Sequence, residues 1–304
     1  MATPRKVVRK VSECYVDILK LNSVELNSMT IILLNERFKR KSNDIMQIFE
    51  SVNQSWNETF YIMFLRMLGG AENKGAMTEL GSRVTSYMLQ REKQSVVSLE
   101  AMLLGGAGLL SEYPADNYTQ RLRDEFAHLS SKYSIVSMKA EEWQLNTRYP
   151  HNHPTLRLAQ VAACIHRSSL SMSRALECRT ADDVYELFSG RASDYWLEHF
   201  IAGSHSPVTS RRIGHNKSDM LGINLVAAIM YAYGAYTHSE SVTEHMYGLL
   251  ENISAESNHY TIPWYAAGVE PTNAAQSQAL IQLSKEYCTH SRCEECPLSH
   301  RLSR

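Results

Sequence analysis

Hydrophobic residues recur at helical spacing along almost the whole chain. Between residues 56 and 67 (WNETFYIMFLRM) they follow one another at intervals of three and four, which predicts an amphipathic helix. The glycine pair at 69–70 is expected to end that helix. The stretch 100–110, EAMLLGGAGLL, is apolar on nearly every side and predicts a buried helix. Asp116 or Asn117 is expected to cap the next helix.

The second half shows the same period without any useful β-alternation. Helices are predicted at 155–170, 180–189, 193–203, 219–236 and 274–288. The sequence RYPHNHP at 148–154 contains two prolines, which exclude a continuous helix. We therefore predict an all-α, multi-helical fold. It comprises two helical lobes, 1–147 and 155–304, joined by a proline-containing crossing at 148–154 and ending in a cysteine-containing turn.

The amino-acid composition supports this fold class and limits the cellular location and the partners that we expect. With 14 glycines and 8 prolines in 304 residues, the chain is poor in the turn residues that a β-sandwich or barrel needs. With a net charge of −1, the protein as a whole is not attracted electrostatically to nucleic acid or to acidic membranes. No signal peptide and no bilayer-spanning stretch is evident, and six cysteines do not form the framework of a secreted protein. We expect a cytoplasmic protein with no membrane partner.

The sharpest chemical motif is the C-terminal sequence YCTHSRCEECPLSH. Cys288, Cys293 and Cys296 have the spacing C-x4-C-x2-C, and His300 would complete a tetrahedral structural zinc site, with His290 in reserve. An iron–sulfur cluster usually takes four thiolates, so zinc is favoured. The three sulfurs are then expected to converge. The alternative is that these cysteines are reduced residues packed in a terminal turn.

Positive charge is concentrated in two stretches that could neutralise phosphates. The first, RFKRK, contributes four cations: Arg37, Lys39, Arg40 and Lys41. The second contributes three: Arg211, Arg212 and Lys217. A solvated helix face explains any one of these residues equally well, so nucleic-acid binding is a hypothesis at this point.

Four polar residues beside apolar sequence are candidates for a pocket: Glu100, Asn152, Arg157 and Glu256. Because the neighbours of Arg157 are apolar, we expect it to be buried and paired, with Glu100 or Glu256 as the natural partner. Each glutamate could instead be a hydrogen-bonded structural carboxylate. No phosphate-binding loop, dinucleotide fingerprint, zinc-protease motif or nucleophile elbow is present, so no catalytic residue is predicted.

Seven phrases in a fixed order resemble a bacterial family described as domain of unknown function 2851: WNETFYIMFLRMLG, LEAMLLGGAGLL, NHPTLRLAQVA, LGINLVAAIMYAYG, AESN, AAQSQALIQL and YCTHSRCEEC. The resemblance implies that longer members carry a further N-terminal region with an aspartate and a Glu-x-x-Lys-like element. That region is similar to the Mg²⁺-binding core of restriction-type nucleases. The chain would then correspond to the helical part alone. Its tail is also distantly similar to that of endonuclease III-like DNA glycosylases, but it lacks their fourth cysteine and differs in the first spacing.

These observations favour a non-catalytic helical module that is associated with nucleic acid or accessory to a nuclease. A helical protein-interaction or scaffold protein is the alternative, supported by the neutral net charge and the missing enzyme motifs. A hydrolase that uses Glu100 or Glu256 is a third hypothesis. Salt-dependent binding of nucleic acid would separate the first from the second, because phosphate contacts weaken steeply as salt rises.

Overall fold

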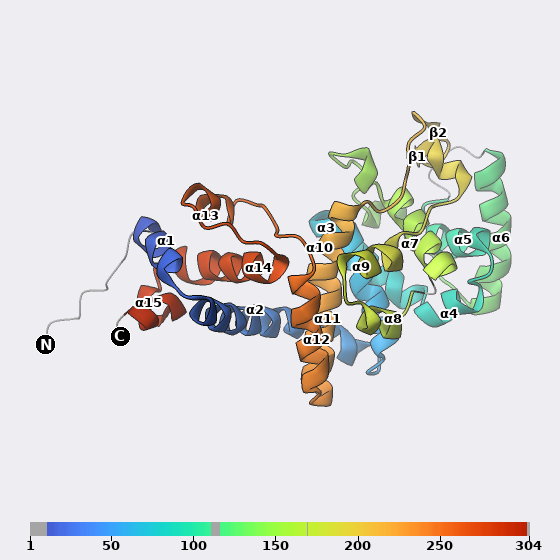
Figure 1. Cartoon of the computed structure of the whole chain (residues 1–304). Coiled ribbons are helices and arrows are strands. Elements are labelled where there is room, and N and C mark those ends of the chain that lie inside the picture. The colour runs from blue at the N-terminus through green and yellow to red at the C-terminus, as the bar shows by residue number, and fades with distance from the viewer. Residues whose placement is uncertain (1–10, 111–115, 169, 303–304) are drawn as a thin grey trace, which may run out of the picture. The chain divides into compact units, whose positions relative to one another are not determined.

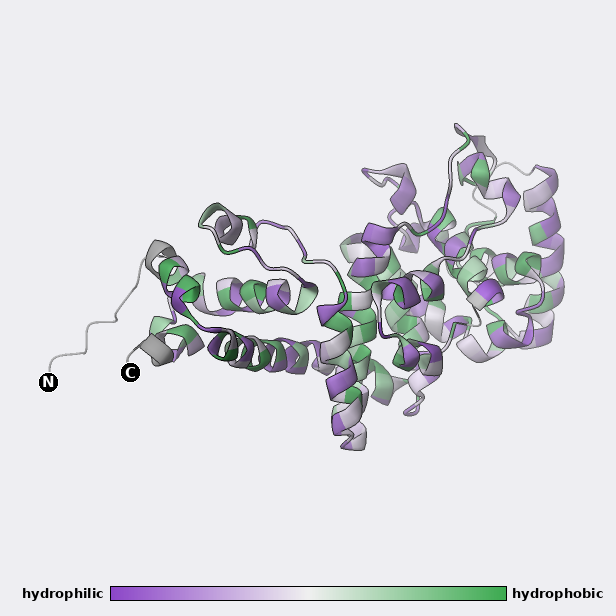
Figure 2. Ribbon diagram, in the orientation of Figure 1, coloured by the Kyte–Doolittle hydropathy of each residue, from purple (hydrophilic) through white to green (hydrophobic). Residues whose placement is uncertain are grey.

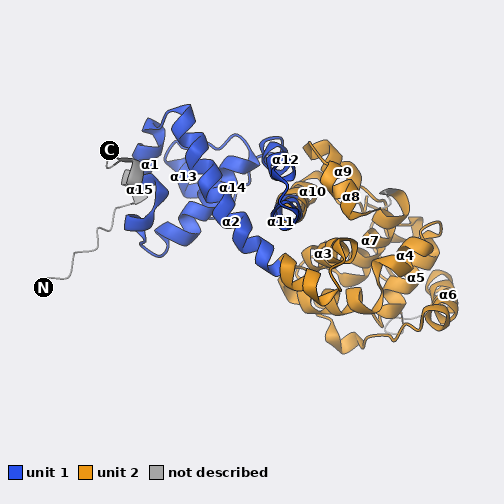
Figure 3. Cartoon of the chain, turned by 90° about the horizontal axis from the view of Figure 1, so that it is seen from below, with its two compact units in different colours: residues 1–44, 227–304 blue, residues 45–226 orange. Residues whose placement is uncertain are grey.

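The computed structural model describes residues 11–110, 116–168 and 170–302. Its contacts divide the chain into two compact units, shown in Figure 3. Unit 1 combines Met1–Asp44 with Ala227–Arg304, and unit 2 is Ile45–Val226. The described residues are helical apart from loops and one short hairpin, which confirms the predicted all-α, multi-helical class (Figure 1).

Unit 2 holds most of the short helices and the hairpin. Its elements are α3 (Trp56–Arg83), α4 (Ser86–Arg91), α5 (Val96–Gly106), α6 (Asn117–Tyr133), η1 (Ala140–Glu142), η2 (Pro150–Asn152), α7 (Pro154–Ser168), α8 (Met172–Glu177), α9 (Ala181–Phe188), η3 (Asp194–Leu197), β1 (His199–Ile201), β2 (Ser204–His205), α10 (His215–Leu221) and η4 (Gly222–Val226). Here η1, η2 and η3 are 3₁₀ turns, and η4 is a π-helical turn.

Unit 1 is built from both ends of the chain. Its elements are α1 (Val11–Lys20), most of α2 (Ser23–Ser51), α11 (Ala227–Thr237), α12 (Glu240–Glu251), α13 (Ile262–Ala266), α14 (Ala274–Gln282), the π-helical η5 (Leu283–Cys288), the 3₁₀ turn η6 (Cys293–Glu295) and α15 (Pro297–Leu302). Met29 and Leu33 of α2 share an apolar cluster with Leu280 and Leu283. That shared core is the physical reason why the two ends form one unit.

The centre of unit 2 is α5, which packs against both α6 and α7. Its sequence is apolar on all faces, and the hydroxyl of Ser95 caps its start by accepting from the backbone N–H of Ser98. Figure 2 shows hydrophobic residues along α5 and hydrophilic ones along much of α6. Gly105 lies directly against the ring of Phe126, so the missing side chain allows α5 and α6 to approach closely.

The predicted cap and the predicted helix break both agree with the structure. Asp116 caps α6 in a capping box with Thr119. The glycine pair at 69–70 also breaks the helix that begins at Trp56, as predicted. Gly70 adopts a non-helical φ of +63°, and a second helical segment follows it within α3 and runs to Arg83.

The helix predicted over residues 193–203 is wrong. Only Asp194–Leu197 forms a 3₁₀ turn, and the following residues form the antiparallel hairpin of β1 and β2, in which His199 lies opposite His205. Gly203 at φ +72° allows the reversal of the chain. The apolar spacing of this segment therefore reflects a 3₁₀ turn that buries Trp196, followed by a hairpin that buries His199 on its first strand and exposes its second strand.

The proline-containing segment 148–154 interrupts helix as expected. Pro150–Asn152 forms a 3₁₀ turn, and α7 starts at Pro154, where a proline needs no backbone donor. This segment lies inside unit 2, so the compact units do not coincide with the predicted lobes 1–147 and 155–304.

One helical run among the described residues, His215–Thr237, is long and apolar enough to cross a membrane by length and composition. It comprises α10, η4 and α11. Because 61% of its most apolar window is buried within the fold, it also fits the description of a core helix. Length and hydropathy alone are therefore weak evidence for a membrane span.

Candidate functional site

Glu100 lies on α5 and is completely buried. The indole N–H of Trp196 and the hydroxyl of Tyr118 both donate to its Oε2 atom at 2.8 Å. Burial raises the pKa of Glu100, and the hydrogen bonds from Trp196 and Tyr118 oppose that rise. This geometry matches the alternative of a structural carboxylate, because its hydrogen bonds run to protein donors and its side chain is sealed from solvent.

Glu100 should give the stability of the protein a recognisable dependence on pH. A raised pKa means that the folded state holds the proton more tightly than the unfolded state. The free energy of unfolding should therefore fall as the pH rises from 4.5 through the raised pKa. Glu100→Gln keeps an acceptor for both donors and removes this slope. Urea titrations of both proteins from acid to neutral pH test this, and parallel pH profiles would contradict it.

Arg157, on the first turn of α7, is buried as predicted, with 7% of its surface exposed. Its acceptors are not Glu100 or Glu256 but two neutral amides: Nη1 donates to Gln160 Oε1 and Nη2 donates to Asn152 Oδ1, both at 2.8 Å. Its buried Nε–H has no hydrogen-bond partner within the described part of the chain. A buried guanidinium without a carboxylate is costly and leaves a donor available.

Lys217 feels the positive charge of Arg157, and Arg211 acts together with Arg157 on His151. Burial and the charge of Arg157 lower the pKa of Lys217, on α10, to about 8, and burial lowers that of Arg157 itself to about 10. Burial, Arg211 and Arg157 together lower the pKa of His151. For the residues that the structure describes, no carboxylate contributes to the pKa of Arg157 or Lys217. We call Arg157, Arg211 and Lys217 the cationic cluster.

Arg211 is held within the fold, whereas its neighbour Arg212 is exposed. Its Nε donates to the carbonyl of Trp196 at 3.0 Å, and its guanidinium lies 3.5 Å from the ring centroid of Phe200. Its remaining donors bind residues of the preceding loop: Ser206 Oγ, the carbonyl of Pro207 and Thr209 Oγ1. Arg211 therefore supplies positive charge to the cluster, while each of its three nitrogen atoms is engaged in hydrogen bonds within the fold.

A chain of hydrogen bonds links the polar residues of unit 2. Trp196 connects Glu100 to Arg211, because its indole binds Glu100 and its carbonyl accepts from Arg211. Gln160 then connects Arg211 to Arg157, since its amide donates to the Arg211 carbonyl at 2.7 Å. The sequence did not single out Trp196 or Gln160. For Gln160 the available signal was its position one helical turn after Arg157.

Glu256, the fourth predicted pocket residue, belongs to unit 1. Its carboxylate accepts from Gln278 Nε2 at 2.7 Å and from Asn258 Nδ2 at 3.2 Å. Gln278 in turn accepts from Arg37 Nε at 2.6 Å. Glu256 is thus part of an internal network of unit 1, while Glu100, Asn152 and Arg157 belong to unit 2.

The cations of RFKRK are mostly engaged within unit 1. Besides the bond from Arg37, Arg40 donates to Gln282 at 2.7 Å and pairs with Glu286 at 3.1 Å. Burial lowers the pKa of Arg37 to about 10. Lys41 is half-buried with its Nζ 5.1 Å from the Phe38 ring centroid, and Lys39 is exposed. Arg37 and Arg40 thus connect α2 to α14 and η5.

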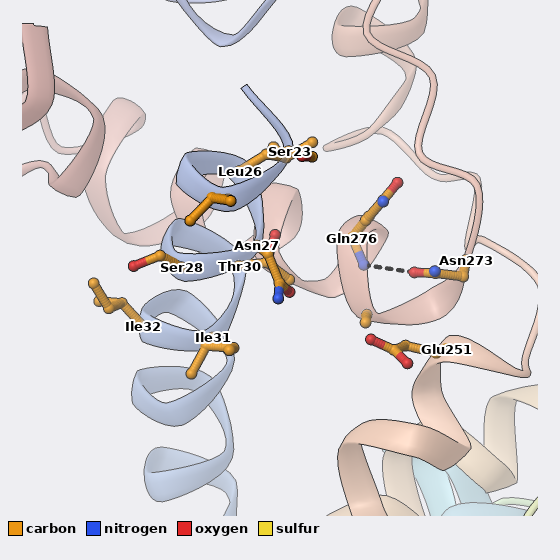
Figure 4. Close-up of a pocket in the computed structure, with 12 residues that line it drawn as sticks. Ser23, Leu26, Asn27, Ser28, Thr30, Ile31, Ile32, Glu251, Asn273 and Gln276 are labelled. Carbon is orange, nitrogen blue, oxygen red and sulfur yellow. Dashed lines mark hydrogen bonds between the residues drawn. The ribbon is translucent and has the colours of Figure 1, made fainter. Parts of the chain in front are cut away.

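A groove of about 720 Å³ runs between α2 and the start of α14 in unit 1 (Figure 4). Asn27 and Thr30 project from α2 toward the side where Gln276 and Glu251 lie. Among the described residues that line the groove, Glu251 alone is charged, so they supply no acid–base pair for catalysis. Five large apolar side chains of α1 and α2 are exposed: Val16, Leu19, Val24, Ile31 and Ile32.

The predicted zinc ligands follow one another through the C-terminal turns. Cys288 ends η5, Cys293 begins η6 and Cys296 precedes α15, while the side chain of His300 lies outside the described residues. Across the described residues, no group of three or more histidine, cysteine, aspartate or glutamate side chains is arranged to hold a metal ion. Zinc binding by this set stays a prediction.

Comparison with known proteins identifies a family. A model described as "Protein of unknown function (DUF2851)" matches residues 5–259. The chain belongs to the DUF2851 family. No curated protein and no solved structure matches this DUF2851 chain. The matched region contains all of unit 2 and its cationic cluster, whereas the three tail cysteines lie beyond it.

Proposed function

We propose that this DUF2851 protein is a non-catalytic helical module that binds nucleic acid through phosphates at the cationic cluster. The observation that carries the proposal is the electrostatic environment of Arg157 and Lys217, to which no carboxylate among the described residues contributes. Burying cations without counter-charge is unfavourable, and an anion supplied by a ligand offsets that cost. The buried Nε–H of Arg157 is a donor that such an anion can use.

The surface beside the cluster supports nucleic acid as the source of that anion. His151 and Asn152 are exposed on the 3₁₀ turn that precedes α7. Just before them, Tyr149 is 55% exposed and carries the guanidinium of Arg148 5.4 Å from its ring centroid. An exposed aromatic ring beside cations is the combination on which unpaired bases stack. Single-stranded nucleic acid is therefore the class of ligand that we expect.

Binding should weaken both with salt and with rising pH. Fluorescence anisotropy of a labelled single-stranded oligonucleotide should show an affinity that falls steeply with salt. Above pH 8 the affinity should also fall, because Lys217 loses its proton from a pKa of about 8, which a bound phosphate shifts upward. Lys217→Gln should lower the affinity roughly tenfold and remove the pH step.

The matched control is Lys139→Gln, which removes the same charge from an exposed position of unit 2. It should leave the affinity and its pH step nearly unchanged. Equal losses in the two variants would reduce the effect to overall charge and would refute a specific role for Lys217. Absence of salt-dependent binding by the wild type would refute the proposal itself.

One observation favours the protein-interaction alternative. The groove between α2 and α14 adjoins exposed apolar residues of α2, notably Val24, which is 76% exposed. Contiguous exposed apolar surface is characteristic of interaction sites. If the oligonucleotide experiment gives no binding, a protein-interaction module becomes the favoured function. The hydrolase alternative has less support, since Glu100 is sealed and Glu256 is tied to Gln278.

A further inference from the structure

Four of the six cysteines belong to unit 1, and they come from opposite ends of the chain. Three are the tail residues Cys288, Cys293 and Cys296. The fourth is Cys14 on α1, which lies more than 270 positions earlier in the sequence. The tail motif alone lacks the fourth thiolate that an all-cysteine metal centre requires.

The fold of unit 1 brings Cys14 to the tail. Cys14 and Cys296 are buried members of the same apolar cluster, and Cys288 packs against that cluster. In agreement, α1 contacts α15, and η6 contacts both η5 and α15. The N-terminal helix therefore lies against the C-terminal turns, and the four cysteines share one region of unit 1.

The pKa shifts of Cys288 and Tyr15 agree with the placement of the four cysteines in one region. Burial, together with smaller contributions from the thiols of Cys14, Cys296 and Cys293, raises the pKa of Cys288 to about 12. Cys288 and Cys14 both raise the pKa of Tyr15 as well, after the larger effect of burial. Each of the other three thiols is thus close enough to Cys288 to oppose its ionisation.

We propose that Cys14, Cys288, Cys293 and Cys296 bind one metal centre as a set of four thiolates. Cys14 then takes the place that the sequence alone assigned to His300. The described side chains are not arranged around an ion, so binding draws the sulfurs together by rotation about Cα–Cβ bonds and adjustment of the short turns between 288 and 296. The four thiols release their protons to solvent as their sulfurs coordinate the metal.

Four thiolates suit either a single zinc ion or a [4Fe–4S] cluster, and both would serve this structure in the same way. The centre joins α1 to the turns that follow α14, so it holds the two ends of unit 1 together. Its contribution would be to folding, since four protein ligands leave no open position on zinc for substrate.

The test is metal analysis of the full chain purified without oxygen or chelators. We expect about one zinc per chain, or about four iron and four acid-labile sulfide with visible absorption for a cluster. Cys14→Ser and Cys14→Ala should each lose most of the metal. His300→Ala should retain it, and Cys178→Ser, which changes a cysteine of unit 2, is the matched control and should also retain it.

Three results would overturn the proposal. These are a wild-type protein without stoichiometric zinc or iron, Cys14 variants that keep the full metal content, and a His300→Ala variant that loses it. Circular dichroism of the Cys14 variants shows whether they fold. Because Cys14 is also a core residue, a second readout uses Co²⁺ added to chelator-treated wild type. Its spectrum should show a four-thiolate site, and a spectrum with fewer sulfur ligands would contradict the assignment.

Discussion

Replacing Gly190 with alanine should destabilise unit 2 by about 3 kcal/mol. A Cβ atom at this position would overlap the backbone nitrogen of Cys164 and the carbonyl of Ala163. Both belong to α7, whose backbone cannot move aside without breaking helical hydrogen bonds. The end of α9 is also held there, since Cys164 Sγ donates to the carbonyl of Phe188 at 3.2 Å. The backbones of α7 and the turn after α9 therefore touch with no room for a methyl group.

Gly75→Ala provides the matched control within the same unit. Gly75 lies in α3, and a Cβ atom there meets nothing within 4 Å. The substitution should raise stability by up to about 1 kcal/mol, because alanine has the higher helix propensity. The free energy of unfolding in urea measures both variants. A loss below about 0.5 kcal/mol for Gly190→Ala would contradict the packing argument.

Replacing Arg211 with methionine should cost about 3 kcal/mol or more of unfolding free energy. The side chain is 1% exposed, and its guanidinium donates to the carbonyls of Trp196 and Pro207 and to two hydroxyls. Methionine fills much of the volume but removes the donor from the buried carbonyl of Trp196 and the three hydrogen bonds to the loop. The loop from 206 to 211 and the 3₁₀ turn that presents Trp196 to Glu100 would both lose their anchor.

The neighbouring Arg212→Met removes the same charge from an exposed position. Its stability should stay within about 0.5 kcal/mol of the wild type, as is usual for surface substitutions. Chemical denaturation of the pair therefore separates the two arginines that the sequence placed in a single basic cluster. Equal effects of the two substitutions would show that the contacts of Arg211 contribute little.

The sequence was most informative where local chemistry decides the structure. Helical spacing of apolar residues identified α3 and α9, and the apolar stretch at 100–110 identified α5, which ends earlier, at Gly106. The cap at Asp116 follows from a side chain that bonds to its own first turn. Burial of Arg157 could also be predicted, because its neighbours in α7 are apolar. In each case the relevant partners lie within a few positions along the chain.

The secondary-structure prediction was wrong where contacts with residues distant in the sequence outweigh the local pattern of apolar residues. Residues 193–203 have apolar spacing compatible with a helix, yet Trp196 is held by Glu100 and by Arg211, and Gly203 turns the chain into a hairpin. This outcome cannot be read from the period of the sequence alone, because it depends on packing against other elements.

By itself the sequence determined the helical class, the main helices and their caps, and the family resemblance, because these depend on residues close together in the chain. The tertiary structure alone decided which distant groups meet. It placed Glu256 with Gln278 in unit 1 and left Arg157 with amide partners in unit 2. It also brought Cys14 to the tail cysteines. These pairings follow from burial of apolar helix faces, whose partners are selected by the whole core and not by spacing along the chain.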